Sequence, residues 1–325
     1  MLWSTVKKIL HIPEKMPRFV QIAVTNICNK DCGMCIRFQV PIEQRHLDFE
    51  DFKKIVSQFN GQVEAVTLVG MGEPLVYPHL FDAIRYLKER GIKARITTNA
   101  ILLKKRADQL IEAGLDHIHL SAEDVRDTVT LDAIKDFIDK RNAHGTGRPS
   151  IVLQPILFGG KVEEGGRSVQ DVYDLIEWGA NNGVDRVNIA RVDLRTDPTM
   201  QRPDIAEEKE IFKELARLRK KYNMRIDCLQ DQVFNGIAGF AYKYFKYLLR
   251  LDSYCYRFQD YTYIDVTGNV HPCPIDMDQV MGNVFETNLQ DVWKGEKYCG
   301  LRDNQEAYRF CRTCDFLKLK QVSPR

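Results

Sequence analysis

The sequence predicts an α/β protein built around a parallel sheet. Six β-type segments alternate with helical segments at about 25 to 35 residues per unit, which is the spacing of parallel βαβ construction. Two of the expected helices are followed by glycines, Gly91 and Gly114, as C-terminal caps often are. The alternation alone fits either an open sheet or a barrel, and in both folds ligands bind at the carboxyl ends of the strands.

The expected strands are short segments that contain β-branched residues and precede turns. They lie at residues 19–25, 65–69, 93–98, 117–121, 151–157 and 186–190. The helical patterns between them cover residues 49–59, 79–90, 104–113, 131–142 and 169–181. This regular order indicates one large α/β unit in the central part of the chain.

The alternation fades after about residue 193. A charged helix at 206–222, a strand at 225–228 and a helix at 233–251 are expected next, followed by a cysteine-bearing hairpin that turns at 267–269. We therefore expect three regions. They are a basic N-terminal segment (1–18), the α/β core (19–230) and a small C-terminal α+β domain (231–325).

Composition sets the expected environment. The formal net charge is only +2, and no nucleic-acid-binding motif is evident, so no nucleic-acid partner is expected. No segment approaches about eighteen consecutive apolar residues, and the N-terminus lacks the features of a signal peptide. A cytoplasmic location is expected, where the nine cysteines would remain without disulfides. Seven of them fall into two groups with ligand-like spacing, which points to metal.

The first group, Cys28, Cys32 and Cys35, lies in the loop after the first expected strand. Three thiolates in one loop can hold three corners of a cubane cluster and leave the fourth iron open to a ligand. The alternatives are a zinc site that takes a fourth ligand such as His46, or three thiols without a metal. The loops after the next three strands carry the sequences GMGEP, TTN and SAED at the same expected edge.

With this cysteine loop after the first strand and GMGEP after the second, the chain resembles the radical S-adenosylmethionine (SAM) superfamily. The resemblance spans residues 19 to about 193 and implies a partial (β/α)6 barrel. It also implies a [4Fe–4S] cluster on the three cysteines, with SAM bound to the open iron and cleaved to a 5′-deoxyadenosyl radical. By the same resemblance, the expected SAM-binding residues are Gly70, Gly72, Glu73, Asn99 and Ser121. Met34 stands where an aromatic residue usually packs near the adenine, and its thioether can fill the same space.

The second group consists of Cys255, Cys273, Cys311 and Cys314. Four thiolates can enclose a second cluster fully, although four cysteines also suit zinc. The surrounding sequence resembles the SPASM/twitch extension of radical SAM enzymes, and the short cysteine array is closest to the single-cluster twitch form of a diol-oxidising dehydrogenase. The resemblance therefore implies two [4Fe–4S] clusters in all. A cluster with four protein ligands has no open iron, so the second one is expected to carry electrons.

Cys228 and Cys299 belong to neither group, and a lone cysteine is most often a small buried hydrophobe. Cys228 has a second interpretation as a catalytic residue, because radical epimerases use a cysteine near the substrate to return a hydrogen atom. His117 and His119 share the alternation of Ser121 and should face the same side of their strand.

The leading functional hypothesis is a radical SAM oxidoreductase that dehydrogenates an alcohol carbon of a sugar or cyclitol. The alternatives are a peptide-modifying enzyme that crosslinks or epimerises its substrate, and a non-catalytic iron–sulfur electron carrier. The expected partners are a small-molecule or peptide substrate and a reductant such as flavodoxin or ferredoxin. Aromatic and basic residues at 240–257, together with the basic N-terminus, also allow a peripheral membrane contact.

Overall fold

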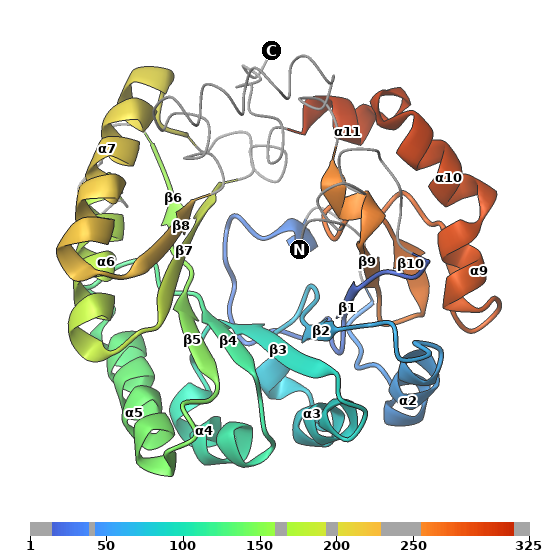
Figure 1. Cartoon of the computed structure of the whole chain (residues 1–325), viewed down its shortest axis with the longest axis horizontal. Coiled ribbons are helices and arrows are strands. Elements are labelled where there is room, and N and C mark those ends of the chain that lie inside the picture. Colours follow the sequence, from blue (N-terminus) through green and yellow to red (C-terminus); the bar gives the residue numbers. More distant parts are fainter. Residues whose placement is uncertain (1–14, 39–42, 160–167, 193–200, 229–254, 315–325) are drawn as a thin grey trace.

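The computed structural model describes residues 15–38, 43–159, 168–192, 201–228 and 255–314. Within these ranges a curved and mostly parallel sheet is surrounded by helices (Figure 1), which confirms the expected α/β fold. The parallel strands are β1 (Phe19–Ile22), β2 (Ala65–Leu68), β3 (Lys93–Thr98), β4 (His117–Leu120), β5 (Ser150–Leu153), β6 (Ile156–Leu157), β7 (Arg186–Arg191) and β8 (Arg225–Cys228).

Six helices connect these strands and form the outer ring. They are α2 (Phe49–Ser57), α3 (Leu80–Lys88), α4 (Leu103–Glu112), α5 (Thr128–His144), α6 (Val169–Asn182) and α7 (Ile205–Tyr222). Four of them begin at a side chain that accepts hydrogen bonds from the first turn: Asp48, Asp127, Ser168 and Asp204. For α6 and α7 the bonds are reciprocal capping boxes, so the local sequence alone defines where these helices start.

One expected strand is divided in the structure. The sequence predicts a single strand at residues 151–157, but β5 ends at Leu153 and β6 begins at Ile156. Pro155 lies between them, and a proline has no N–H to donate to a neighbouring strand. The break also leaves the side chain of Gln154 free to bond His119, whose Nδ1 lies 2.9 Å from Gln154 Oε1.

The two faces of the sheet differ in polarity. Side chains that point to the helices are apolar and fully buried, as for Ile96, Ile118 and Val187. Alternate residues point to the inner, concave face, and many of these are polar or charged, such as Arg95 on β3. The hydrophobic core therefore lies between the strands and the helices, and the inner face is available for ligands.

The cysteine-rich C-terminal region is joined to the core sheet. Strand β9 (Tyr261–Ile264) runs parallel to β1, and β10 (Asn269–His271) and β11 (Gly282–Asn283) extend the same sheet in antiparallel fashion. The expected hairpin turn between β9 and β10 is present, with Gly268 at a φ of +82°. That region continues with η5 (Tyr256–Gln259), α9 (Leu289–Lys294), α10 (Glu296–Asp303), η6 (Gln305–Ala307) and α11 (Arg309–Thr313). The helix expected at 233–251 lies outside the described residues.

A glutamine at the end of α2 ties the core to this C-terminal region. The amide of Gln58 donates to the carbonyl oxygen of Val284 at 2.9 Å and accepts from the backbone N–H of Leu289 at 2.8 Å. Both bonds span more than two hundred residues of sequence. Together with the β1–β9 pairing, they hold the two cysteine-bearing regions in one structure.

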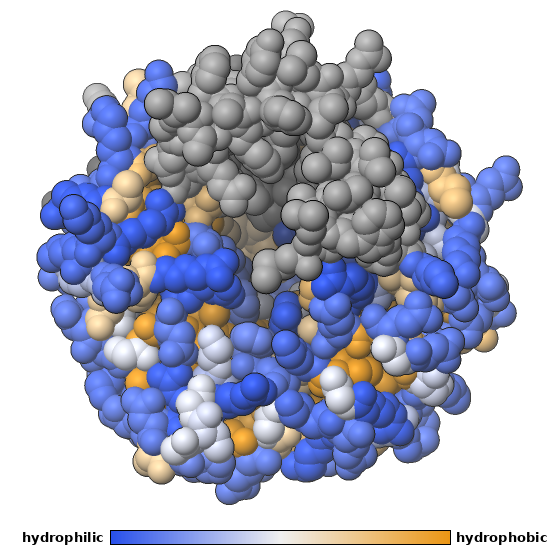
Figure 2. Space-filling view, viewed as in Figure 1, coloured by the Kyte–Doolittle hydropathy of each residue, from blue (hydrophilic) through white to orange (hydrophobic). Residues whose placement is uncertain are grey.

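Hydrophilic side chains cover most of the outer surface in the view of Figure 2. Among the helices described, none is long and apolar enough to cross a membrane.

Replacement of Gln58 by alanine should weaken the attachment of the C-terminal region. We expect the free energy of unfolding to fall by about 1 to 3 kcal/mol, because two hydrogen bonds with partly buried partners are lost. Urea denaturation under anaerobic conditions measures this change. Gln62→Ala, at an exposed neighbouring position, is the matched control and should leave stability within about 0.5 kcal/mol. Equal stability of the two variants would contradict the coupling role.

Candidate active site

The GMGEP turn after β2 packs directly on the backbone that leaves β1. A Cβ atom on Gly70 would lie 2.5 Å from that of Ala23. One on Gly72 would lie 2.6 Å from the carbonyl oxygen of Thr25 and closer still to that of Ile27. No side chain fits at such distances, so these glycines allow the turn to lie against the segment that leads into the cysteine loop.

Glu73 holds three loops together from a buried position. The residue is only 3% exposed, and its backbone N–H donates to the carbonyl oxygen of Ile27 at 2.9 Å. The carboxylate accepts from Leu75 N at 3.0 Å, Thr98 Oγ1 at 2.6 Å and Asn99 N at 2.8 Å. Burial raises the pKa of the Glu73 carboxyl, and these three donors partly offset that rise. Its oxygens are thus engaged by the protein itself, and direct contact with the SAM ammonium stays a prediction.

The TTN turn after β3 reaches the first cysteine. The side-chain amide of Asn99 donates to Asn29 Oδ1 at 2.9 Å and lies 3.9 Å from Cys28 Sγ. The next residue, Ala100, has a φ of +63°, and its N–H is held by Thr98 Oγ1 at 3.1 Å. A non-glycine residue in this region is strained and is kept there by its surroundings, which fixes the position of Asn99. Asn99 therefore lies between the cysteine loop and the edge of the sheet.

The cysteine loop carries free thiols that suit an iron–sulfur cluster. Cys28, Cys32 and Cys35 are all half-buried and free of disulfides, and Met34 beside them is also half-buried. The loop is closed by a bond from Cys35 N to Cys32 O at 2.9 Å and by Arg37, which donates to the carbonyl oxygen of Lys30 at 2.7 Å. Across the residues described here, no three His, Cys, Asp or Glu side chains converge on one point as the ligands of a single metal ion do. The thiolates of a cubane bind different irons, so three thiols in one loop fit that cluster without such convergence.

Two other expected residues lie at the same edge. The backbone N–H of Ser121 donates to Thr98 O at 2.9 Å, and its side chain follows the inner-face alternation of β4. His46 is the residue that a zinc site in the first loop would borrow as its fourth ligand. Its Nδ1 lies 2.8 Å from Thr25 Oγ1, so that ring nitrogen fastens the segment after β1.

The second cysteine group gathers around the start of η5 and the end of β10. Buried Gln305 holds the backbone of Cys255 from both sides, accepting from its N–H at 2.7 Å and donating to its carbonyl oxygen at 3.4 Å. Burial raises the pKa of the Cys255 thiol. Arg257 partly offsets that rise, and the nearby thiols of Cys273 and Cys314 add to it. A turn from Cys314 N to Cys311 O at 3.3 Å joins the remaining pair. The buried thiol of Cys255 would gain from an iron cluster that stabilises the thiolate, so this group of cysteines fits the expected second cluster. Nothing in the sequence pattern pointed to Gln305.

Cys228 lies in the hydrophobic core. It pairs in register with Ile189 on β7 and shares the outer face of the sheet, where it is 4% exposed. That face is covered by helices, whereas a hydrogen donor to substrate must reach the inner face. The structure therefore favours the packing interpretation of Cys228 over the catalytic one. Cys299 is exposed on α10.

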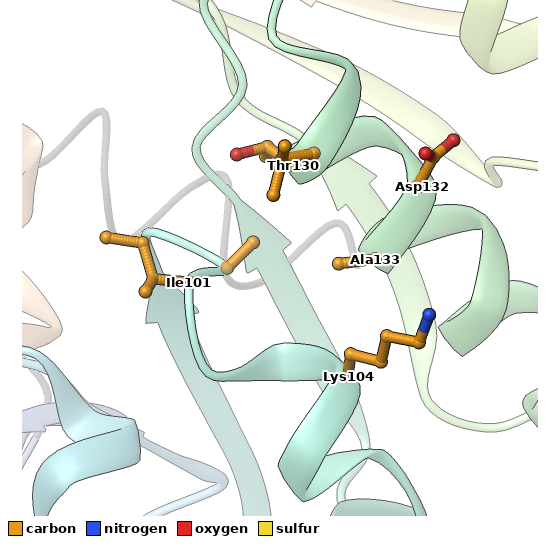
Figure 3. Close-up of a pocket in the computed structure, with 7 residues that line it drawn as sticks. Ile101, Lys104, Thr130, Asp132 and Ala133 are labelled. Atoms are coloured by element: carbon orange, nitrogen blue, oxygen red, sulfur yellow. The ribbon is translucent and has the colours of Figure 1, made fainter.

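An additional pocket lies outside the barrel, next to the TTN turn. It has a volume of about 320 Å³ and lies between the starts of α4 and α5 (Figure 3). Its lining residues are Ala100, Ile101, Lys104, Val129, Thr130, Asp132 and Ala133. Sequence reasoning did not anticipate this pocket, because it depends on how two helices meet.

Comparison with known families now identifies the class of protein. The family model of the radical SAM superfamily matches residues 22–187, which is half of the chain, and that of the SPASM iron–sulfur cluster-binding domain matches residues 255–315. This chain belongs to the radical SAM superfamily. Its barrel binds a [4Fe–4S] cluster and SAM, and its C-terminal domain binds additional iron–sulfur clusters, as the resemblance implied.

Particular relatives can be named at two levels of similarity. The chain is 25% identical over 344 aligned residues to the tungsten-containing aldehyde ferredoxin oxidoreductase cofactor-modifying protein of Pyrococcus furiosus, with 94% of this chain and 91% of the relative covered. It is 37% identical over 108 residues to the GTP 3′,8-cyclase of Chlorobaculum tepidum, where 32% of each chain is covered. Among solved structures, SuiB of Streptococcus suis bound to S-adenosylmethionine matches with a TM-score of 0.71 at 22% identity, covering 97% of this chain and 74% of SuiB. At that identity the match shows the fold alone.

Replacement of Gly72 by alanine should disrupt the first cluster site. The added methyl group collides with two backbone oxygens, which should lower the free energy of unfolding by about 1 to 3 kcal/mol. Iron analysis after anaerobic reconstitution should show a reduced content. Gly33→Ala is the control inside the cysteine loop, since no atom lies within 4 Å of the position that its added methyl group would take, and normal loading is expected. Equal iron content in both variants would contradict the role assigned to Gly72.

Replacement of Glu73 by glutamine removes the negative charge but keeps the shape of the side chain, so it tests whether the carboxylate holds the TTN turn in position. The new amide NH2 faces backbone N–H donors, so stability should fall by about 1 to 3 kcal/mol. The displaced Asn99 should weaken SAM binding roughly tenfold, a change of about 1.4 kcal/mol. Equilibrium binding of SAM to the cluster-loaded protein measures this, with exposed Glu112→Gln as the control. Unchanged affinity would show that the TTN turn keeps its place without the carboxylate.

Proposed function

We propose that this protein is a radical SAM oxidoreductase that dehydrogenates an alcohol carbon of a sugar or cyclitol. The observation that carries the proposal is the shared strand β1. It leads into the first cysteine loop and pairs along its length with β9, which lies between Cys255 and Cys273 in the sequence. Strands next to both cysteine groups are therefore neighbours in one sheet, which suits electron transfer between the barrel and the second site.

The first site supplies the chemistry when it is loaded, because a reduced [4Fe–4S] cluster and SAM together generate a 5′-deoxyadenosyl radical that abstracts a hydrogen atom. The residues of the chain position this chemistry. Cys28, Cys32 and Cys35 supply three thiolates, while Glu73 and Asn99 fix the loops around them. Polar side chains on the inner face then hold the substrate beneath the loops.

The second site explains why the net reaction would be an oxidation. Four protein thiolates leave no iron open to substrate, so Cys255, Cys273, Cys311 and Cys314 suit a group that only accepts and releases electrons. Loss of one hydrogen atom, followed by one electron and one proton, converts an alcohol carbon to a carbonyl. A cluster held by these cysteines would accept that electron and pass it to an oxidised carrier protein, while the reductant would supply the electron used to cleave SAM.

A peptide-modifying activity is the second candidate. The chain matches the structure of SuiB bound to its precursor peptide over 98% of its length, with a TM-score of 0.71. That likeness is of fold at 19% identity. The relative from Pyrococcus furiosus is described as cofactor-modifying, which favours a small-molecule substrate.

Loss of the second cluster should separate SAM cleavage from substrate oxidation. In Cys255→Ala, iron should fall from about eight to about four per chain, and dithionite should still drive formation of 5′-deoxyadenosine from SAM. The variant should no longer oxidise the substrate. Mass spectrometry of reactions with panels of sugars, cyclitols and peptides measures this loss. Cys299→Ser removes an exposed thiol and should match the wild type.

Two outcomes would overturn the proposal. If fully loaded wild-type protein forms no 5′-deoxyadenosine, the chain is an electron carrier. If Cys255→Ala still oxidises the substrate, the second site is not the electron acceptor.

A further inference from the structure

The inner face of the sheet carries a group of basic side chains near the amino ends of β3, β4 and β7, at the opposite end of the strands from the first cysteine loop. Arg95 on β3 pairs in register with His117 on β4, so both point to the same face. Arg186 begins β7 and pairs with Val152, which pairs in turn with His119 on β4. Because His119 lies two residues after His117, Arg186 points to the same face, two residues further along the strands. The guanidinium of Arg95 also lies 5.5 Å from the ring centroid of Phe19, another inner-face residue. Three basic groups from three strands thus share the concave side of the barrel.

These groups have fewer polar partners than buried cations normally have. In the part of the chain that is described, Arg95 makes no hydrogen bond and no ion pair, and its Nε is buried without a partner. The Nε of Arg186 is buried without a hydrogen bond in the same way, and its Nη1 makes a long ion pair with Asp227 Oδ2 at 3.7 Å. His117 likewise has no hydrogen-bond partner within these ranges. Buried donors are almost always satisfied in folded proteins, so the two unsatisfied Nε donors of Arg95 and Arg186 require an explanation.

The neighbouring carboxylates are engaged elsewhere. Glu64 pairs with Arg18 at 2.7 Å, Asp116 with Lys88 at 2.8 Å, and Asp227 with Arg225 at 2.8 Å. Asp116 also accepts from the backbone N–H of Ala94 at 2.9 Å. Each of these acids therefore has a cation of its own, and the charge on the two inner arginines is only partly balanced.

The electrostatic consequences agree with this geometry. Burial lowers the pKa of Arg95, and the nearby charge of Arg186 lowers it further. Burial together with the same two arginines lowers the pKa of His117 to about 4, so its ring is neutral at pH 7 and offers one N–H donor. Two guanidinium groups that repel each other and a neutral imidazole thus present more donors than the one long ion pair with Asp227 engages.

We propose that Arg95 and Arg186, assisted by His117, bind an oxyanion of the substrate, either a phosphate ester or a carboxylate. This inference rests on the proposed function and names the substrate class. Arg95 precedes Asn99 by four residues, so the anion site lies about 13 Å along the strand from the cysteine-loop edge. The anion is therefore an anchor remote from the reacting carbon, and its binding energy positions the rest of the substrate. Charge-assisted bonds to guanidinium groups are well suited to phosphate and carboxylate.

Binding of inorganic phosphate and of succinate to the full chain tests the proposal directly. Isothermal titration at constant ionic strength, with sodium chloride as the reference salt, should show saturable binding of at least one of the two anions. Arg95→Gln and Arg186→Gln should each weaken that binding roughly tenfold or more, because each removes a charge-assisted contact. Arg217→Gln on the exposed side of α7 is the matched control and should bind like the wild type. Preference for phosphate identifies a phosphate ester, and preference for succinate identifies a carboxylate.

The melting temperature without added anion is a second measurement. It distinguishes an arginine that binds an anion from one that stabilises the fold. Removal of an unpaired and repelled cation should leave the melting temperature of Arg95→Gln equal to or above that of the wild type. If neither anion binds, or if both arginine variants bind as the wild type does, the proposal is wrong. A lower melting temperature in both variants would also overturn it, since it would show that the arginines stabilise the fold.

SAM cleavage without substrate separates this inference from the proposed function. Because it depends on the first cysteine site, the wild type and the exposed control Arg217→Gln should form 5′-deoxyadenosine at rates within about twofold of each other. If the wild type forms none, the proposed function fails while anion binding is still measurable.

Discussion

The close approach of the GMGEP turn to the backbone leaving β1 is the contact on which the first site depends. Gly72 permits this approach, and the bond from Glu73 N to Ile27 O fixes it. Because the Glu73 carboxylate then accepts from Thr98 and Asn99, one buried group holds together the ends of β1, β2 and β3. A buried carboxylate is stable only when donors surround it, and the local sequence supplies them from the backbone and from Thr98. The loops that carry the SAM site thus keep fixed relative positions, as a site that orients a reactive group requires.

Strand β1 extends the same constraint to the second site. It pairs with β2 on one side and with β9 on the other, so a shift of either neighbour would change the register of both. The hydroxyl of Tyr261 on β9 donates to Gln21 on β1, which adds a side-chain contact on the inner face. Electron transfer depends on a fixed separation of donor and acceptor, and a continuous sheet provides it without a hinge. The C-terminal region is a domain in sequence but part of the barrel sheet in structure.

The sequence was sufficient for features that depend on short-range chemistry. Strand alternation, the hairpin turn at Gly268 and the cysteine spacings each follow from local residue types, and the fold and family agree with them. Features set by packing between distant segments were not predictable. Gln305 supports Cys255 across fifty residues, and nothing in its surroundings marks it for that role. The register that turns Cys228 outward depends on how β8 pairs with β7, which a single strand does not specify.

The two faces of the sheet have different roles, which explains how the barrel accommodates polar and charged side chains in its interior. Stability comes from the outer face, where Ile96, Ile118 and Val187 pack against helices with no exposure. The inner face carries a smaller apolar cluster, Ala23, Tyr263 and Val266, beside its polar and charged side chains. An arginine without a protein partner is nevertheless unfavourable, and local departures of this kind are expected where a ligand completes the structure. A substrate held at one end by Arg95 and Arg186 and facing Asn99 at the other would be oriented by two fixed points on the same sheet. Orientation of that kind directs a radical to one carbon among several similar ones.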